Sequence, residues 1–149
     1  QSMHFAFLFN WAKKPWLTQK WSRSIMDRYY GNGVANAYLG DEDQGQMSAW
    51  FVMAALGLFQ TDGGCRVNPI YEIASPLFEK VVIDLGGLYG RGDSFVIEAK
   101  NVSRKNKYIQ SAVLNGKKLS TFYFQASELL KGGELILIMG DKPNYRWGI

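Results

Sequence analysis

The chain is organised around the stretch GDEDQGQMSAW, residues 40–50. Three consecutive carboxylates, Asp41, Glu42 and Asp43, run directly into a long apolar segment. This pattern predicts an acidic loop followed by a buried helix over residues 44–56. An aspartate at the start of a helix accepts hydrogen bonds from the unpaired backbone N–H groups of the first turn, and the helix dipole favours its ionised form. We therefore expect Asp43 to cap this helix.

The three acids also form a candidate catalytic or metal site. In an extended segment side chains alternate, so Asp41 and Asp43 would face one side and Glu42 the other. Two carboxylates that face one cavity can act as a general base and its neighbour, or as half of a calcium site. The local pattern also fits ordinary acids on a solvated loop. An EF-hand is excluded, because the twelfth position of such a loop is Val52 instead of glutamate.

The segments on either side of the acidic loop have helical patterns. Residues 3–11 are mostly apolar on every face, which predicts a helix buried on all sides with partners outside this chain. Residues 16–30 carry apolar side chains at every fourth position, as an amphipathic helix does, and Gly31 begins the turn that ends it. Apolar residues surround the axis of the helix after the loop, which stops at Gly57. We expect this helical part to belong to a larger α-helical array.

Between residues 60 and 70 the pattern changes to period-two alternation, which is typical of strands. Asn115-Gly116 is a strong signal for a two-residue β-hairpin. The predicted fold class is therefore α+β, with a helical part at residues 1–62 and an antiparallel all-β part at residues 63–149 that forms a sandwich or a sheet. The predicted strands are residues 80–85, 94–99, 107–114 and 134–139, and residues 126–130 are predicted to be a short helix.

The composition indicates a folded chain and excludes several functions. The 149 residues are 47% hydrophobic and 15% aromatic, which is enough to form a core. The net charge is +4, but the basic residues are dispersed, so we expect no nucleic-acid binding. The single cysteine, Cys65, cannot form an internal disulfide. No apolar run approaches the ~20 residues that span a bilayer, so we expect no membrane insertion.

Several long blocks of the chain resemble the C-terminal portion of the glycoside hydrolase family 92 α-mannosidases. They follow the family's order and cover nearly the whole chain. The blocks are NWAKKPWLTQ at residues 10–19, GDEDQGQMSAWFV at 40–52, ALGLF at 55–59, IASPLF at 73–78, YIQSAVLNG at 108–116, and the pairs at 139–140 and 143–144.

The resemblance implies a calcium-dependent exo-α-mannosidase that inverts the anomeric centre of α-mannoside glycans, with α-1,2-linked mannosides as the expected substrates. It also implies an N-terminal β-sandwich, an (α/α)6 catalytic barrel and all-β structure after the barrel. Residues 1–62 would then be the terminal helices of the barrel, and residues 63–149 a sandwich-like C-terminal domain. The competing hypothesis is a non-catalytic carbohydrate-binding or structural β module.

The resemblance also assigns site residues. Asp43 matches the general base, and Asp41 matches a second aspartate that is a supporting or alternative base. His4, the only histidine, matches a residue in a block that lines the sugar site, although a lone imidazole is usually a hydrogen-bonded core residue. Glu42 and Gln44 are further candidates for substrate binding, since Gln44 could orient water or a sugar hydroxyl, or satisfy the loop backbone.

The family's general acid lies upstream, in a block that is absent here. An inverting glycosidase needs that acid roughly 6.5–9.5 Å from the base, and Asp41 is too close to Asp43 in sequence to supply it. The principal calcium ligands are expected outside this chain, so no metal ligand is assigned. The sequence begins at Gln1 and soon enters an apolar segment, without a signal peptide. We therefore expect a piece of a longer polypeptide that is inactive without the remainder, in a compartment that the sequence leaves open.

Overall fold

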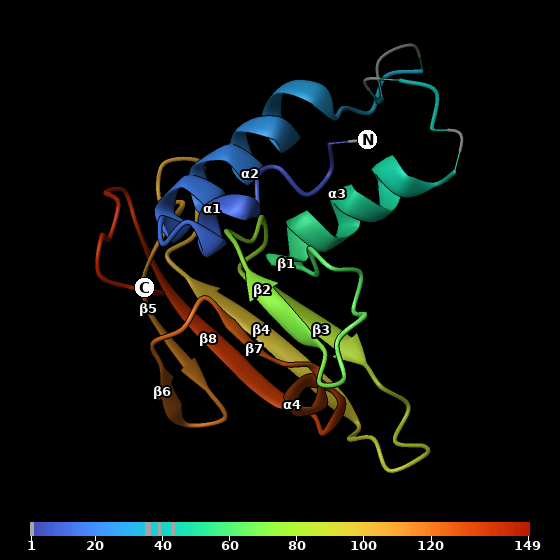
Figure 1. Ribbon diagram of the computed structural model, residues 1–149, viewed down its shortest axis with the longest axis vertical. Coiled ribbons are helices and arrows are strands. Elements are labelled where there is room, and N and C mark those ends of the chain that lie inside the picture. The colour runs from blue at the N-terminus through green and yellow to red at the C-terminus, as the bar shows by residue number, and fades with distance from the viewer. Residues whose placement is uncertain (1, 35–36, 39, 43) are drawn as a thin grey trace.

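The computed structural model shows the three N-terminal helices at one end of the molecule, and most of the strands with a short fourth helix at the other (Figure 1). It describes residues 2–34, 37–38, 40–42 and 44–149. The helices are α1 (Leu8–Trp11), α2 (Pro15–Tyr29), α3 (Gln46–Leu56) and the short α4 (Ala126–Leu130). The strands are β1 (Leu58–Phe59), β2 (Ile70–Ile73), β3 (Lys80–Asp84), β4 (Ser94–Lys100), β5 (Tyr108–Leu114), β6 (Lys117–Leu119), β7 (Tyr123–Gln125) and β8 (Gly133–Gly140).

The strands form two sheets around a shared core. The smaller sheet has the order β1-β2-β7 and the larger one the order β3-β4-β8-β5-β6. Alternate residues of β4 and β8 point inward, as the period-two pattern predicts, so Phe95, Ile97 and Leu137 are fully buried. They share one apolar cluster with Ile73 and Phe124 of the smaller sheet. The mixed helix-and-sheet class predicted from the sequence is confirmed.

The larger sheet departs from the prediction in one pairing. Strands β4 and β8 are parallel, whereas the other neighbouring strands of this sheet are antiparallel. The expectation of a purely antiparallel β part is therefore wrong. The hairpin at Asn115-Gly116 is confirmed, because both residues have positive φ, 48° and 76°, and they join β5 to β6.

The predicted helix over residues 3–11 is helical only from Leu8 onward. The preceding residues form turns, in which the N–H of Phe7 donates to the carbonyl of His4 at 2.9 Å. The carbonyl of Met3, which a helix would pair with Phe7, instead accepts the indole N–H of Trp50 at 2.7 Å. A long-range hydrogen bond has therefore replaced the first helical one.

Helix α2 buries a polar face against the β part. Gln19 accepts the N–H of Ile109 at 2.9 Å, and Arg23 donates to the carbonyl of Pro76 at 2.6 Å. The apolar stripe of α2 faces the other way, and Trp21 in that stripe is 38% exposed. In the described part of the chain, no helix has both the length and the apolar character needed to cross a bilayer.

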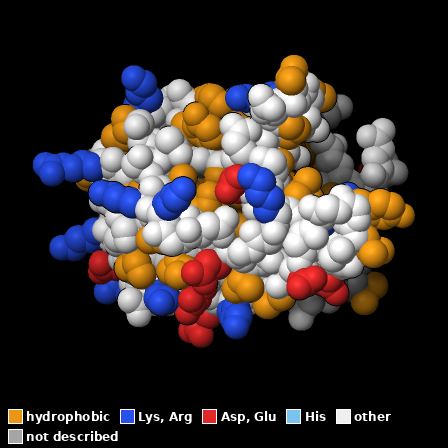
Figure 2. Space-filling view, turned by 90° about the horizontal axis from the view of Figure 1, so that it is seen from below, with side chains coloured by type: hydrophobic (Ala, Val, Ile, Leu, Met, Phe, Trp, Pro, Cys, Tyr) orange, Lys and Arg blue, Asp and Glu red, His pale blue; other side chains and the backbone are white. Residues whose placement is uncertain are grey.

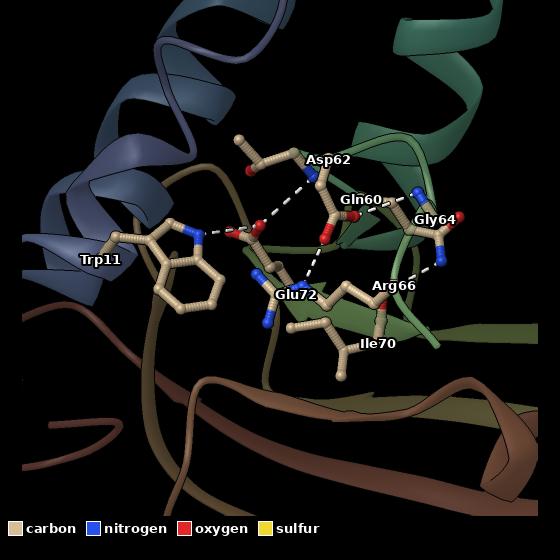
Figure 3. Close-up of polar contacts among 8 residues, drawn as sticks. Trp11, Gln60, Asp62, Gly64, Arg66, Ile70 and Glu72 are labelled. Atoms are coloured by element: carbon tan, nitrogen blue, oxygen red, sulfur yellow. Dashed lines mark hydrogen bonds and ion pairs between the residues drawn. The ribbon is translucent and has the colours of Figure 1, made fainter. Parts of the chain in front are cut away.

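A buried carboxylate joins the helical part to the smaller sheet. Glu72 on β2 is 1% exposed and accepts hydrogen bonds from Asn10 Nδ2 at 3.1 Å, Trp11 Nε1 at 3.0 Å and the backbone N–H of Thr61 at 3.3 Å. Figure 3 shows the indole nitrogen of Trp11 directed at this carboxylate. The guanidinium of Arg66 lies 4.7 Å from the centre of the Trp11 ring. The junction between α1 and β2 thus contains a buried carboxylate, its three hydrogen-bond donors and a cation–π contact.

Figure 2 shows the molecule from the β end, where Lys and Arg side chains stand mainly along one side and Asp and Glu lie among them and along the lower edge. Among the described ion pairs, Lys131 Nζ lies 2.7 Å from Glu128 Oε1. Exposed pairs of this kind contribute little to the free energy of folding. This face therefore carries both signs of charge, with hydrophobic side chains between them.

Candidate active site

The acidic loop joins α2 to α3 beside the N-terminal segment (Figure 1). Helix α2, helix α3 and the N-terminal segment surround a cavity of about 240 Å³. The cavity is lined by Ser2, Met3, Ile25, Tyr29, Tyr30, Met47 and Trp50. The segment that carries His4 and the start of the helix after the acidic loop therefore share one cavity.

Glu42 caps helix α3. Its Oε2 accepts the backbone N–H of Met47 at 2.8 Å, and its Oε1 accepts the backbone N–H of Ser48 at 2.8 Å as well as the Ser48 hydroxyl. The N-cap position is Gly45, with φ of 67°, and the helix begins at Gln46. The predictions that the helix begins at residue 44 and that Asp43 is its N-cap are therefore wrong.

Glu42 reaches the start of α3 because its side chain is long. Glu42 has φ of 55°, and its longer side chain spans the turn back to the first helical N–H groups. The dipole and unpaired N–H groups of the helix start that the sequence assigned to an aspartate are thus used by the neighbouring glutamate. Asp43 itself lies outside the described residues, so its catalytic assignment stays a prediction.

The surroundings of Glu42 and Tyr30 shift the pKa of each group in a defined direction. The hydroxyl of Ser48, and then the backbone N–H groups of Ser48 and Met47, hold the pKa of Glu42 below its ordinary value. Burial, with the nearby charge of Glu42, raises the pKa of Tyr30 to about 12. Glu42 is therefore ionised and Tyr30 a neutral phenol at neutral pH, so Tyr30 can donate a hydrogen bond but is not a general base.

The cap predicts a pH-dependent difference between the chain and its Glu42→Gln variant. The folded-state pKa of Glu42 lies below its ordinary value of 4.5, so the stabilisation is present above that pH and is lost as the pH falls. We expect Glu42→Gln to lower the melting temperature at pH 7, and the difference to shrink at about pH 3. The exposed Glu79→Gln is the matched control. An equal difference at both pH values would contradict the cap.

Aromatic rings form one wall of the site, and the sequence reasoning missed them. Tyr30 stacks on Trp50 with ring centres 5.4 Å apart and on Phe51 at 5.1 Å, and it meets Tyr38 edge to face at 5.9 Å. Tyr30 follows the apolar stripe of α2 directly, so helical periodicity does not mark it. Its contacts connect the end of α2, the loop and α3.

The other predicted site residues that the structure describes are His4, Asp41, Glu42 and Gln44. His4 is half-buried in the N-terminal turns, and its ring meets Phe5 edge to face at 5.0 Å. Asp41 and Gln44 are both exposed. Within the part of the chain that the structure describes, the Glu42 side chain accepts hydrogen bonds from the start of α3.

Within residues 2–34, 37–38, 40–42 and 44–149, no group of three His, Cys, Asp or Glu side chains is placed to hold a metal ion. The carboxylate of Glu42 is already engaged with the start of α3. We therefore assign no step of a reaction to a metal held by these residues.

Comparisons with known proteins agree on one family. The model of the glycosyl hydrolase family 92 catalytic domain matches residues 1–141. An uncharacterized secreted glycosidase of Arthroderma benhamiae is 31% identical over 144 residues, which are 95% of this chain and 18% of that protein.

Solved structures from this family superpose on nearly the whole chain. A family GH92 α-mannosidase from Bacteroides thetaiotaomicron, in complex with mannoimidazole, matches with a TM-score of 0.87 and 35% identity over 99% of this chain and 18% of its own. A family GH92 inverting mannosidase from the same organism matches with a TM-score of 0.85 and 39% identity over 99% of this chain and 19% of its own. The chain thus spans about a fifth of the length of the proteins it matches.

Proposed function

This chain belongs to glycosyl hydrolase family 92, and from that premise we propose that it is the C-terminal part of an exo-α-mannosidase that inverts the anomeric centre of α-1,2-linked mannosides. The observation that carries the proposal is the match over 99% of the chain to an inverting mannosidase, at 39% identity. Residues 1–62 are the last helices of the catalytic barrel in this proposal, and residues 63–149 are the β domain that follows it.

In the proposed reaction, Asp43 is the general base. Its carboxylate takes a proton from water, and the water oxygen forms a bond to the anomeric carbon on the face opposite the leaving group. The glycosidic bond breaks, and an acid from the remainder of the polypeptide protonates the departing oxygen. Asp41 supports the base. The product is mannose of inverted configuration.

His4, Glu42 and Gln44 are proposed to contact the sugar. His4 is half-buried and Gln44 is exposed, and both offer donors and acceptors of the kind that bind hydroxyl groups. Glu42 has a narrower role, because three hydrogen bonds from Met47 and Ser48 occupy its two oxygens. A carboxylate has about four acceptor positions, so one remains for a sugar hydroxyl.

We propose that the remainder of the polypeptide covers the apolar side of α1 and α2. A hollow of about 650 Å³ lies there, lined by Phe5, Ala6, Leu8, Phe9, Ala12, Trp21 and Ile25. Phe5 is 58% exposed and Leu8 41% exposed. Exposed apolar surfaces of this kind are typical of interaction sites. Neighbouring barrel helices would bury it.

Calcium is proposed as the cofactor of the complete enzyme, with its ligands outside this chain. The described residues do not bring three metal-binding side chains together. When bound, the ion would polarise sugar hydroxyls and favour a distorted ring. The residues of this chain contribute the base and the walls around it.

The proposal is tested by mannose release from α-1,2-mannobiose. The complete polypeptide should release mannose steadily, and the isolated 149-residue chain should release none, because the general acid is missing from it. Steady release by the isolated, mass-verified chain would contradict the missing acid. An inactive complete polypeptide, together with saturable mannose binding by the isolated chain, would favour the carbohydrate-binding module instead.

A further inference from the structure

A buried tryptophan connects the two segments that the proposed site requires. Trp50 on α3 is 3% exposed, and its Nε1–H donates to the carbonyl of Met3 at 2.7 Å. Met3 directly precedes His4, and α3 directly follows the acidic loop. A buried indole N–H needs an acceptor, and here the acceptor is 47 residues away in the chain.

This bond determines the local conformation around His4. The Met3 carbonyl accepts from Trp50, while the N–H groups of Phe7 and Leu8 both donate to the carbonyl of His4, at 2.9 and 3.2 Å. The His4 backbone is therefore fixed on both sides, by its own turn and by the anchored residue before it. Loss of the indole donor would leave the Met3 carbonyl without this partner and release the segment.

Two aromatic neighbours hold the ring of Trp50 in place. Tyr30 stacks on it with an interplanar angle of 17°, and Phe7 meets it edge to face at 6.3 Å. Tyr30 in turn contacts Tyr38 in the loop segment. The indole is thus held by α2 and by the N-terminal segment, and it has little freedom to follow a displaced Met3.

We infer that Trp50 is a positioning residue for the proposed hydrolysis, because it holds the His4 segment in place relative to the helix that follows the acidic loop. The inference rests on the proposed function. Trp50 does not touch the sugar in this account. It acts through His4, since a shift of about 1 Å in a substrate-binding group can lower a rate by about 100-fold.

The test uses the complete polypeptide and the variant Trp50→Phe, which keeps an aromatic ring but removes the donor. We expect kcat/KM for α-1,2-mannobiose to fall by roughly tenfold or more, mainly through KM. The matched control is Trp147→Phe, because Trp147 is also buried and its indole N–H also donates to a backbone carbonyl, that of Leu119 at 3.1 Å. This control should keep kcat and KM within about twofold of the unchanged enzyme.

A double-mutant cycle with His4→Ala separates positioning from general stability. If Trp50 acts through His4, Trp50→Phe should change kcat/KM by less than about twofold when His4 is already alanine. If Trp50→Phe does not fold, the benzothiophene analogue of tryptophan at position 50 keeps both fused rings and removes only the N–H.

Three results would overturn the inference without removing the proposed hydrolysis. They are unchanged kinetics for Trp50→Phe, effects of the two substitutions that multiply fully, and unchanged kinetics for His4→Ala, which would also remove His4 from the proposed sugar contacts. An unchanged polypeptide that does not hydrolyse mannosides would instead overturn the proposed function, and with it the inference.

Discussion

Asp43→Asn in the complete polypeptide is expected to lower kcat for α-mannoside hydrolysis by about 10²- to 10⁴-fold, the usual contribution of a general base. An amide cannot take the proton from the attacking water, although it has nearly the same shape. Substrate binding should change little, so KM should stay close to that of the unchanged enzyme. The measurement is the initial rate of mannose release over a range of substrate concentrations.

Two further variants make this result specific. Asp41→Asn should have a smaller effect, because Asp41 supports the base in our proposal. Asp84→Asn is a matched control at the end of β3, where the carboxylate accepts the N–H of Gly86 at 2.8 Å, and it should have no effect on turnover. Near-normal turnover of Asp43→Asn would remove Asp43 from the base role, and a larger loss in Asp41→Asn would transfer that role to Asp41.

Glu72→Leu is expected to reduce the free energy of unfolding by about 3 kcal/mol or more. The substitution removes the acceptor of three hydrogen bonds, from Asn10, Trp11 and Thr61, and leaves donors without a partner in the junction between α1 and β2. A buried donor without a partner costs about 1–3 kcal/mol, and the removed desolvation cost of the carboxylate offsets part of the sum.

The Glu72→Gln variant should lose less. Its amide oxygen can still accept from Trp11, and its NH₂ group can donate to Asn10 if the Asn10 amide turns over, because Asn10 Oδ1 is buried without a hydrogen-bond partner in the described structure. The measurement is urea denaturation of the 149-residue chain, with the exposed Glu79→Leu as control. A Glu72→Leu variant as stable as that control would contradict a structural role for this junction.

The sequence predicted the turns, helix ends and strands that depend on residues close together in the chain. The hairpin at Asn115-Gly116, the end of α3 at Gly57 and the strands around 94–100 and 133–140 lie where the sequence places them. Gly57 has φ of 79°, and a Cβ there would lie 2.7 Å from the ring of Pro76, so glycine is required by both conformation and space. The family resemblance is confirmed by the match over residues 1–141.

The wrong predictions concern features that depend on contacts between residues far apart in the chain. Residues 3–11 are not one helix: the Met3 carbonyl accepts from the distant Trp50, while the N–H of Phe7 donates to His4. Strands β4 and β8 are parallel although each has the alternation of an antiparallel strand, since period two does not encode strand direction. The stripe of α2 was recognised, but periodicity alone does not reveal which face packs inward. Arg23 and Gln19 are buried, and each forms a hydrogen bond with a backbone group of the β part.

The catalytic roles assigned from the sequence stay predictions, and the structure adds geometry that the sequence did not indicate. The sequence identified the acidic loop, yet it assigned the helix cap to an aspartate, whereas the longer Glu42 reaches Met47 and Ser48. Tyr30 carries no motif, and Trp50 was expected only as a residue of the buried helix, whereas the structure shows both in contacts between segments far apart in the chain. The spacing of residues within one helix does not predict contacts between separate segments.

The anomer of mannose that the complete polypeptide releases first tests the central claim most directly. In our account this chain supplies a base that activates water, so the first product of an α-mannoside is β-mannose. Proton NMR of the reaction in its first minutes distinguishes the two anomers before they interconvert. We predict that the β-anomer appears first. If α-mannose appears first, the configuration is retained, a carboxylate nucleophile is indicated, and a water-activating base at Asp43 is contradicted.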